Sequence, residues 1–171
     1  MIVLLLEEGI SQKSLRQIAT EIGSNHRMLS YHFGDLPGLI SAAVAELRRR
    51  ETEAFDDLLA QSSALDGRAV LELFWEHNAS PELRNYFRLL FEYWGTALAD
   101  REHFEGLLSG IVSAWTERLT SILEANGAGP EAATSARLAV GALRGLLLDL
   151  VTTGDFAGVD AAFRHLIARL T

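Results

Sequence analysis

Residues 14–33 read SLRQIATEIGSNHRMLSYHF, and this stretch decides the fold. Its first half places apolar side chains at helical spacing and polar side chains on the opposite face, which predicts an amphipathic helix. Ser14 and Gln17 have the spacing of a capping box, which satisfies two backbone N–H groups at a helix start. Gly23 can adopt the left-handed conformation that ends a helix. We therefore expect a short helix that begins after Ser14 and stops at the glycine.

The second half of the stretch predicts another short helix. Asn25 is a favourable N-cap, and Leu29 and Phe33, four residues apart, can hold this helix against the first. A guanidinium can bridge the guanine acceptors of the major groove, and hydroxyl and imidazole groups suit phosphate oxygens. Two helices joined in this way form a helix-turn-helix, a common reader of duplex DNA. Composition alone leaves equally open a helical hairpin whose outer face is merely solvated.

The motif and its flanks carry an ordered set of residues: Gly9, SLRQIA at 14–19, Ile22, Gly23, Leu29, YHFGD at 31–35, Gly38 and Leu39. Over roughly the first forty residues this set resembles the TetR (tetracycline-repressor-type) family of transcriptional regulators. The resemblance implies that the second helix of the motif lies in the major groove of an operator. The DNA-binding residues expected on this basis are Arg16, Asn25, His26, Arg27, Met28, Ser30, Tyr31 and His32.

The sequence departs from the family pattern at three places. Ser30 stands where the family usually has a tyrosine that contacts phosphate, and Leu36 stands where it usually has a lysine. We also interpret the first helix as truncated and without a basic arm, because Met1 lies only eight residues before Gly9. These departures keep a second interpretation open, a helical dimeric small-molecule-binding or adaptor protein that has lost DNA binding.

Charge is distributed unevenly along the 171 residues, whose net charge is -8. Residues 1–50 carry a balance of +1 and the remaining residues a balance of -9, so only the first part can readily approach phosphate. The run Arg48 to Arg50 cannot share one helix face, and glutamates four residues away predict ion pairs instead. The chain has no cysteine, and the apolar run 2–6 is too short to span a bilayer, so we expect a cytoplasmic protein without membrane contact.

The whole chain shows helical periodicity, with neither strand alternation nor an internal repeat, which predicts an all-α fold of about nine helices. We divide it into a three-helix DNA-binding domain, residues 1–47, and a larger helical domain for effector binding and dimerisation, residues 48–171. No catalytic motif, metal-ligand cluster or cofactor fingerprint is present in the sequence, so we expect no enzyme, no metal site and no cofactor.

Two further surfaces are expected in the larger domain. The helix near residues 130–152 is apolar on more faces than one layer of neighbours requires, which favours a two-fold homodimer over simple closure of the monomer core. The expected interface consists of Leu138, Gly141, Ala142, Gly145, Leu148, Phe163, Leu166 and Ile167.

Bulky aromatic residues also gather between residues 74 and 115, where a pocket for an unidentified small hydrophobic effector is expected. Its expected lining is Phe74, Trp75, His77, Phe87, Phe91, Trp94, Trp115 and Thr116. Aromatic residues at helical spacing are, however, more often plain core than pocket.

Overall fold

The computed structural model describes residues 2–9, 13–61, 66–100, 105–125, 127 and 129–170, with the backbone alone for 105–112 and 170. Within these ranges the regular structure is entirely helical, which confirms the predicted all-α fold of about nine helices. The elements are α1 (Ile2–Glu8), α2 (Leu15–Glu21), α3 (His26–Phe33), α4 (Leu36–Gln61), α5 (Gly67–Asn78), a 3-10 turn (Pro81–Leu83), α6 (Arg84–Ala99), α7 (Glu105–Ala125), α8 (Ala132–Thr153) and α9 (Phe156–Leu170).

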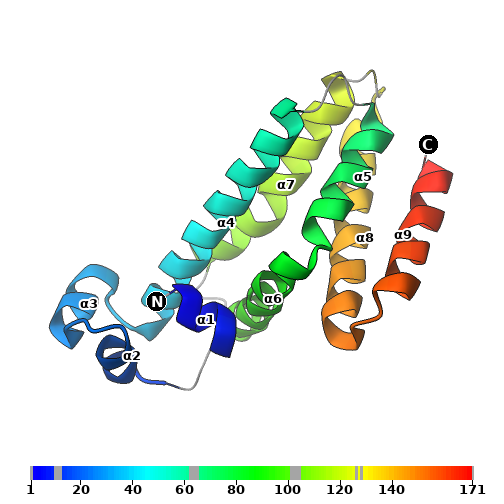
Figure 1. Ribbon diagram of the computed structural model, residues 1–171. Helices are drawn as coiled ribbons and strands as arrows, with labels where there is room; N and C mark the ends of the chain where they lie inside the picture. Colours follow the sequence, from blue (N-terminus) through cyan, green and yellow to red (C-terminus); the bar gives the residue numbers. More distant parts are fainter. Residues whose placement is uncertain are drawn as a thin grey trace.

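The helices form a small group at one end of the molecule and a layered bundle at the other (Figure 1). The short helices α1, α2 and α3 gather at the start of α4, and α4 extends from them along the bundle. Helix α8 is central because it packs against α6, α7 and α9. Helix α1 packs against α6, so the small group is joined to the bundle by two helices, α4 and α6.

The buried side chains fall into two clusters, and α4 contributes to both. Leu39 completes the small cluster of α2 and α3, whereas Ile40 and the following apolar residues of α4 belong to the large cluster of the bundle. Leu5 of α1 also packs in the large cluster. The domain boundary expected after residue 47 therefore falls inside a continuous helix, and residues on its N-terminal side contribute to the bundle core.

Helix α6 is preceded by a 3-10 turn, Pro81–Leu83. The Ser80 side chain, directly before this turn, makes no capping hydrogen bond. Helix α6 buries mainly one side, and Leu98 near its end is 58% exposed. Residues 10–12, 62–65 and 101–104, between successive helices, lie outside the described part of the chain.

Candidate functional site

Local hydrogen bonds fix both helices of the predicted motif. The amide of Gln17 donates to Ser14 Oγ over 3.4 Å, and the Ser14 amide donates to Gln17 Oε1 over 2.8 Å, so the predicted capping box is present. The Arg27 amide donates to Asn25 Oδ1 over 2.8 Å, which confirms Asn25 as the cap of α3. Gly23 has a φ of 65° and makes the turn between the helices. Leu29 is the buried anchor of α3 in the small core.

Seven of the eight residues expected to bind DNA are exposed and Ser30 is half-buried: the seven are Arg16, Asn25, His26, Arg27, Met28, Tyr31 and His32. The Tyr31 side chain is 86% exposed and Met28 is 50% exposed, although such large side chains are usually at least partly covered. The rings of Tyr31 and His32 lie edge to face with centroids 5.2 Å apart. Helix α3 thus presents apolar, aromatic and basic groups to a partner together.

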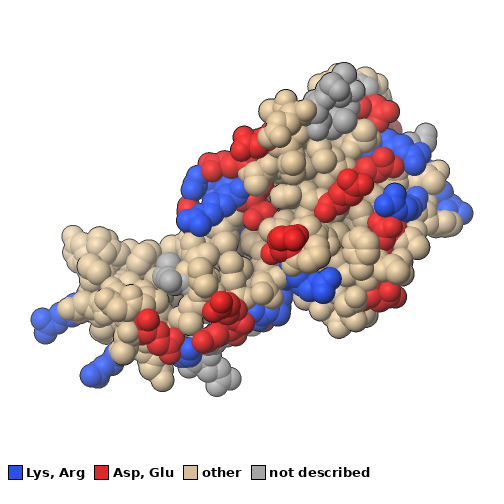
Figure 2. All heavy atoms as spheres, in the orientation of Figure 1, with Lys and Arg blue, Asp and Glu red and all other residues tan. Residues whose placement is uncertain are grey.

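The cations at this end of the molecule have different surroundings. Lys13 forms ion pairs with Glu8 and with Glu21, and its hydrogen bonds to Glu21 and then Glu8 raise its pKa. Among the described residues, Arg16 and Arg27 form no ion pair. Figure 2 shows basic side chains projecting from the end that carries α2 and α3, with acidic side chains on the neighbouring surface. The arginines are therefore the cations of the motif best able to meet phosphates or bases.

Gly38 sets how closely α4 approaches the end of α3, a role that periodicity did not reveal. A Cβ atom added at Gly38 would overlap the carbonyl oxygen of Phe33. The Gly38 amide also donates to Asp35 Oδ1 over 2.9 Å, as expected for an N-cap at Asp35. The sequence signal is a glycine in the first turn of a helix directly after Pro37, where a side chain would ordinarily be accommodated.

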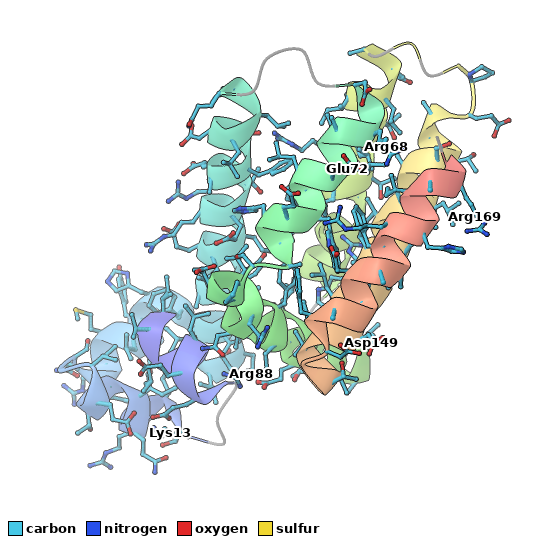
Figure 3. All side chains as sticks on the ribbon, turned by 45° about the vertical axis from the view of Figure 1, so that its right-hand side comes forward. Lys13, Arg68, Glu72, Arg88, Asp149 and Arg169 are labelled. Carbon is cyan, nitrogen blue, oxygen red and sulfur yellow. The ribbon has the colours of Figure 1, made fainter. Side chains whose placement is uncertain are left out.

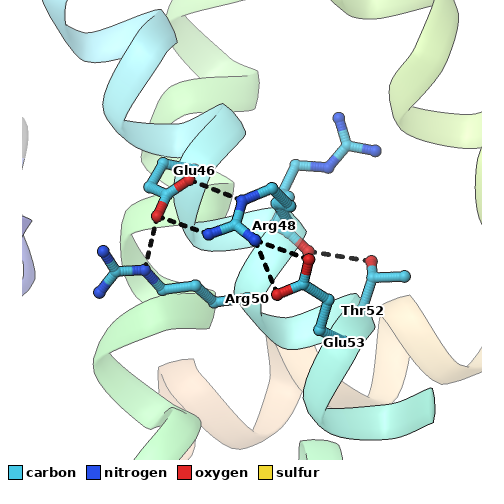
Figure 4. Close-up of polar contacts among 6 residues, drawn as sticks. Glu46, Arg48, Arg50, Thr52 and Glu53 are labelled. Atoms are coloured by element: carbon cyan, nitrogen blue, oxygen red, sulfur yellow. Dashed lines mark hydrogen bonds and ion pairs between the residues drawn. The ribbon is translucent and has the colours of Figure 1, made fainter.

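Arg49 and Arg50 of α4 form ion pairs along their own helix (Figure 4). Arg49 donates to Glu46 and Glu53, and Arg50 donates to Glu46 Oε1 over 2.8 Å. These bonds, from Arg49 first and then Arg50, lower the pKa of Glu46 to about 2. The two four-residue ion pairs predicted from the sequence, Glu46 with Arg50 and Arg49 with Glu53, are confirmed.

A cavity of about 40 Å³ lies inside the bundle between α4, α5, α6, α7 and α8. Five of the eight expected effector-binding residues line it: Phe74, Phe87, Phe91, Trp94 and Trp115. Three do not. Trp75 stacks on Phe163 in the core with ring centroids 4.8 Å apart, His77 lies 3.3 Å from Glu51, and Thr116 borders an open depression near Arg137.

Sequence reasoning missed the charged groups of this cavity. Arg48 and Glu51 of α4 and Arg144 of α8 line it beside the aromatic rings. The Arg144 guanidinium carbon lies 5.0 Å from the Trp94 ring centroid, a cation–π distance. Burial, and then the charge of Arg48, lower the pKa of Arg144 to about 10, so it stays protonated at neutral pH. The available signal was a charged residue among the apolar positions of α8.

The expected dimer surface is partly accessible. Leu138 and Leu148 are 54% and 48% exposed, and Gly141 and Gly145 are also exposed on α8. Ala142 and Leu166 are half-buried. The assignment of Phe163 and Ile167 needs correction, because both are buried in the core of this chain at 1% and 2% exposure and offer no surface to a second copy.

The fold resembles that of a crystal structure described as "the putative transcriptional regulator from Pseudomonas aeruginosa PAO1". The match has a TM-score of 0.77 and covers 99% of this chain and 83% of that chain, at 18% sequence identity. At this low sequence identity, the match shows that the two proteins share a similar fold and no more than that. No protein-family model and no curated protein sequence matches the chain. In the described residues no helix is long and apolar enough to cross a membrane, and no cluster of potential metal ligands is found.

Proposed function

We propose that this protein is a sequence-specific DNA-binding transcriptional regulator of TetR type, a ligand-responsive repressor that binds a palindromic operator as a dimer. The observation that carries the proposal is the geometry of α3. This helix is capped by Asn25, anchored by Leu29 and turned outward with Arg27, Met28 and Tyr31 exposed. The similar fold of a protein described as a transcriptional regulator supports the same class.

In this proposal the two motif arginines have different tasks. Arg27 lies in the first turn of α3, from which a recognition helix contacts base edges, and its guanidinium can bridge guanine O6 and N7. Arg16 lies on α2, which crosses the DNA backbone in such motifs, so it meets phosphate. Arg27 therefore supplies sequence discrimination, and Arg16 supplies affinity for any duplex.

The dimer is proposed to form through the exposed face of α8, which carries Leu138, Gly141, Gly145 and Leu148. Glycines permit close approach of two helices, and the exposed leucines supply apolar area at a self-complementary contact. Two copies related by a two-fold axis then present two α3 helices to successive major grooves. This geometry explains why the proposed operator is palindromic.

Effector response follows from linkage between the cavity and the DNA-binding end. The cavity is walled by α4 and α6, and the same helices hold α1, α2 and α3. Arg88 of α6 donates from Nη2 to the Leu6 carbonyl oxygen over 2.8 Å and so ties α6 to the end of α1 (Figure 3). A ligand that favours a wrongly spaced pair of motifs weakens operator binding by the same factor by which the operator weakens ligand binding.

The test is selection from random duplex DNA by the purified protein at low and physiological salt, followed by sequencing. The wild type should enrich an inverted repeat. Arg27→Ala should lose discrimination by about 1–3 kcal/mol at the affected base pairs, whereas Arg16→Ala should weaken binding to all sequences alike. Arg68→Ala, which removes an arginine on α5, is the matched control and should behave like wild type. If folded, dimeric protein enriches nothing at either salt, the helical dimeric small-molecule-binding or adaptor protein becomes the better interpretation.

A further inference from the structure

The inner cavity combines an apolar wall with a positive charge. Its rings come from α5, α6 and α7, among them Phe74, Phe91 and Trp115. The lining contains more basic than acidic side chains: two arginines, Arg48 and Arg144, and one carboxylate, Glu51. Counted by residue type, these three side chains give the lining a formal charge of +1. A ligand with one negative charge neutralises it, whereas a cationic ligand is repelled.

Arg144 is the group most clearly suited to an anion. Its guanidinium lies among aromatic side chains, with Trp94 5.0 Å away, and burial lowers its pKa from the ordinary value. That lowering means that the folded protein disfavours the charged form of Arg144, because desolvation and Arg48 act in the same direction. A bound carboxylate recovers this cost through charge-assisted hydrogen bonds with the guanidinium.

A second donor lies beside it. Trp94 Nε1 is buried and has no hydrogen-bond partner within the described residues. An unsatisfied buried N–H is costly, so an acceptor at this position is favoured. Glu51 Oε2 lies 3.3 Å from His77 Nε2 on α5 and does not accept a hydrogen bond from Trp94 Nε1. The indole N–H of Trp94 and the guanidinium of Arg144 thus provide neighbouring donors on α6 and α8.

We propose that the effector bound in this cavity is a small apolar monocarboxylate, with its carboxylate at Arg144 and Trp94 and its apolar body among the aromatic rings. This inference rests on the proposed function and narrows its effector to one chemical class. The present cavity of about 40 Å³ has room for about three water molecules. The acid must therefore open it by moving the helices that wall it, and α4 and α6 transmit that movement toward the DNA-binding end.

The experiment compares matched probes that differ in the charge of one group. Octanoate and phenylacetate, and separately octanol, phenethyl alcohol, octylamine and phenethylamine, are each titrated into the protein without DNA. Binding is measured by calorimetry and by quenching of tryptophan fluorescence. At least one acid should bind about tenfold or more tightly than its alcohol and amine. Equal or tighter binding of the alcohols or amines, or binding of neither acid in the millimolar range, overturns the inference.

Variants of the protein test whether Arg144 produces the preference for the acid over its alcohol. Arg144→Gln should reduce the preference for the acid over its alcohol to less than about threefold, and Arg144→Lys should retain most of it. Arg137→Gln removes an exposed arginine from the same helix and should keep the wild-type preference. An Arg144→Gln protein with native helicity and an unchanged preference contradicts the assignment. Acid binding without any enriched DNA sequence would contradict the proposed function alone, and an enriched operator without acid binding would contradict this inference alone.

Discussion

Replacing Arg88 by alanine should loosen the connection between the inner cavity and the proposed DNA-binding end. Arg88 donates to the carbonyl oxygens of Leu6 and Glu7 over 2.8 and 3.3 Å, and to Glu92 Oε1 over 2.9 Å. The two carbonyls belong to the last turn of α1, where a cation also meets the negative end of the helix dipole. Helix α1 has only seven residues, too few to persist by itself, so its position depends on such contacts.

The size of the effect follows from the number and exposure of these bonds. A hydrogen bond to a charged group contributes about 1.5–3 kcal/mol when well shielded from water. Because the Arg88 side chain is 31% exposed, we reduce this to about 1–2 kcal/mol for the whole connection. If that free energy fixes the orientation of the motif, operator affinity should fall about tenfold, since about 1.4 kcal/mol corresponds to one decade.

The assay is fluorescence anisotropy with the selected operator, accompanied by urea unfolding to confirm that the bundle remains folded. Arg84→Ala removes an exposed arginine one turn away on α6 and is the matched control. Gly9→Ala should weaken operator binding too, because its Cβ would lie 2.6 Å from Glu92 Oε2 and 2.7 Å from Arg88 Nη1, at a φ of +78°. Equal operator affinity of the Arg88→Ala and Arg84→Ala proteins would refute the reasoning.

Three further changes test other parts of the structure. Gly38→Ala should destabilise the protein by about 1–3 kcal/mol in urea unfolding and weaken operator binding, because the added methyl group pushes α4 away from the Phe33 carbonyl; wild-type behaviour would contradict this close approach. Asp160→Ala should cost about 1–3 kcal/mol, because Trp75 Nε1 loses its acceptor at 2.9 Å. Hydrogen bonds from Arg164 and Trp75 lower the pKa of Asp160, so its contribution to stability is present above about pH 4. The difference in unfolding free energy between wild type and Asp160→Ala should therefore shrink as the pH falls below that value. A difference that stays constant with pH would argue against a role for the ionised carboxylate. Leu148→Glu should give monomers in sedimentation velocity, whereas Leu98→Glu, at an exposed leucine of α6, should not; a dimeric Leu148→Glu protein would place the interface elsewhere.

The features predictable from the sequence are those whose partners lie close together along the chain. Ser14 and Gln17 are three residues apart, and Asn25 caps an amide two residues ahead, so the ends of α2 and α3 could be inferred without knowing any tertiary contact. The ion pairs of Arg49 were predictable for the same reason. Helical periodicity then supplied the number and order of the helices.

The features that were missed depend on which helix covers which face. Periodicity showed that Phe163 belongs to an apolar stripe, but a stripe covered by Trp75 of the same chain looks identical in sequence to one covered by a second copy. Arg144 was overlooked because a charged residue in a long helix ordinarily faces solvent, as Arg137 and Asp149 of α8 do. Its place in the cavity results from α6 lying across α8, a contact between residues about fifty positions apart.

The sparse positive charge of the motif bears on how the proposed switch can work. Lys13 is held by Glu8 and Glu21, so Arg16 and Arg27 are the motif cations without an ion pair in the described chain. Few phosphate contacts give a weak sequence-independent affinity, and a single motif then binds poorly. Binding by a dimer depends instead on both motifs meeting their half-sites together, because the second contact becomes intramolecular. In the proposed switch, a small movement of α4 or α6 that changes the spacing of the motifs removes that advantage, so the effector needs only a modest preference for the wrongly spaced form to weaken operator binding.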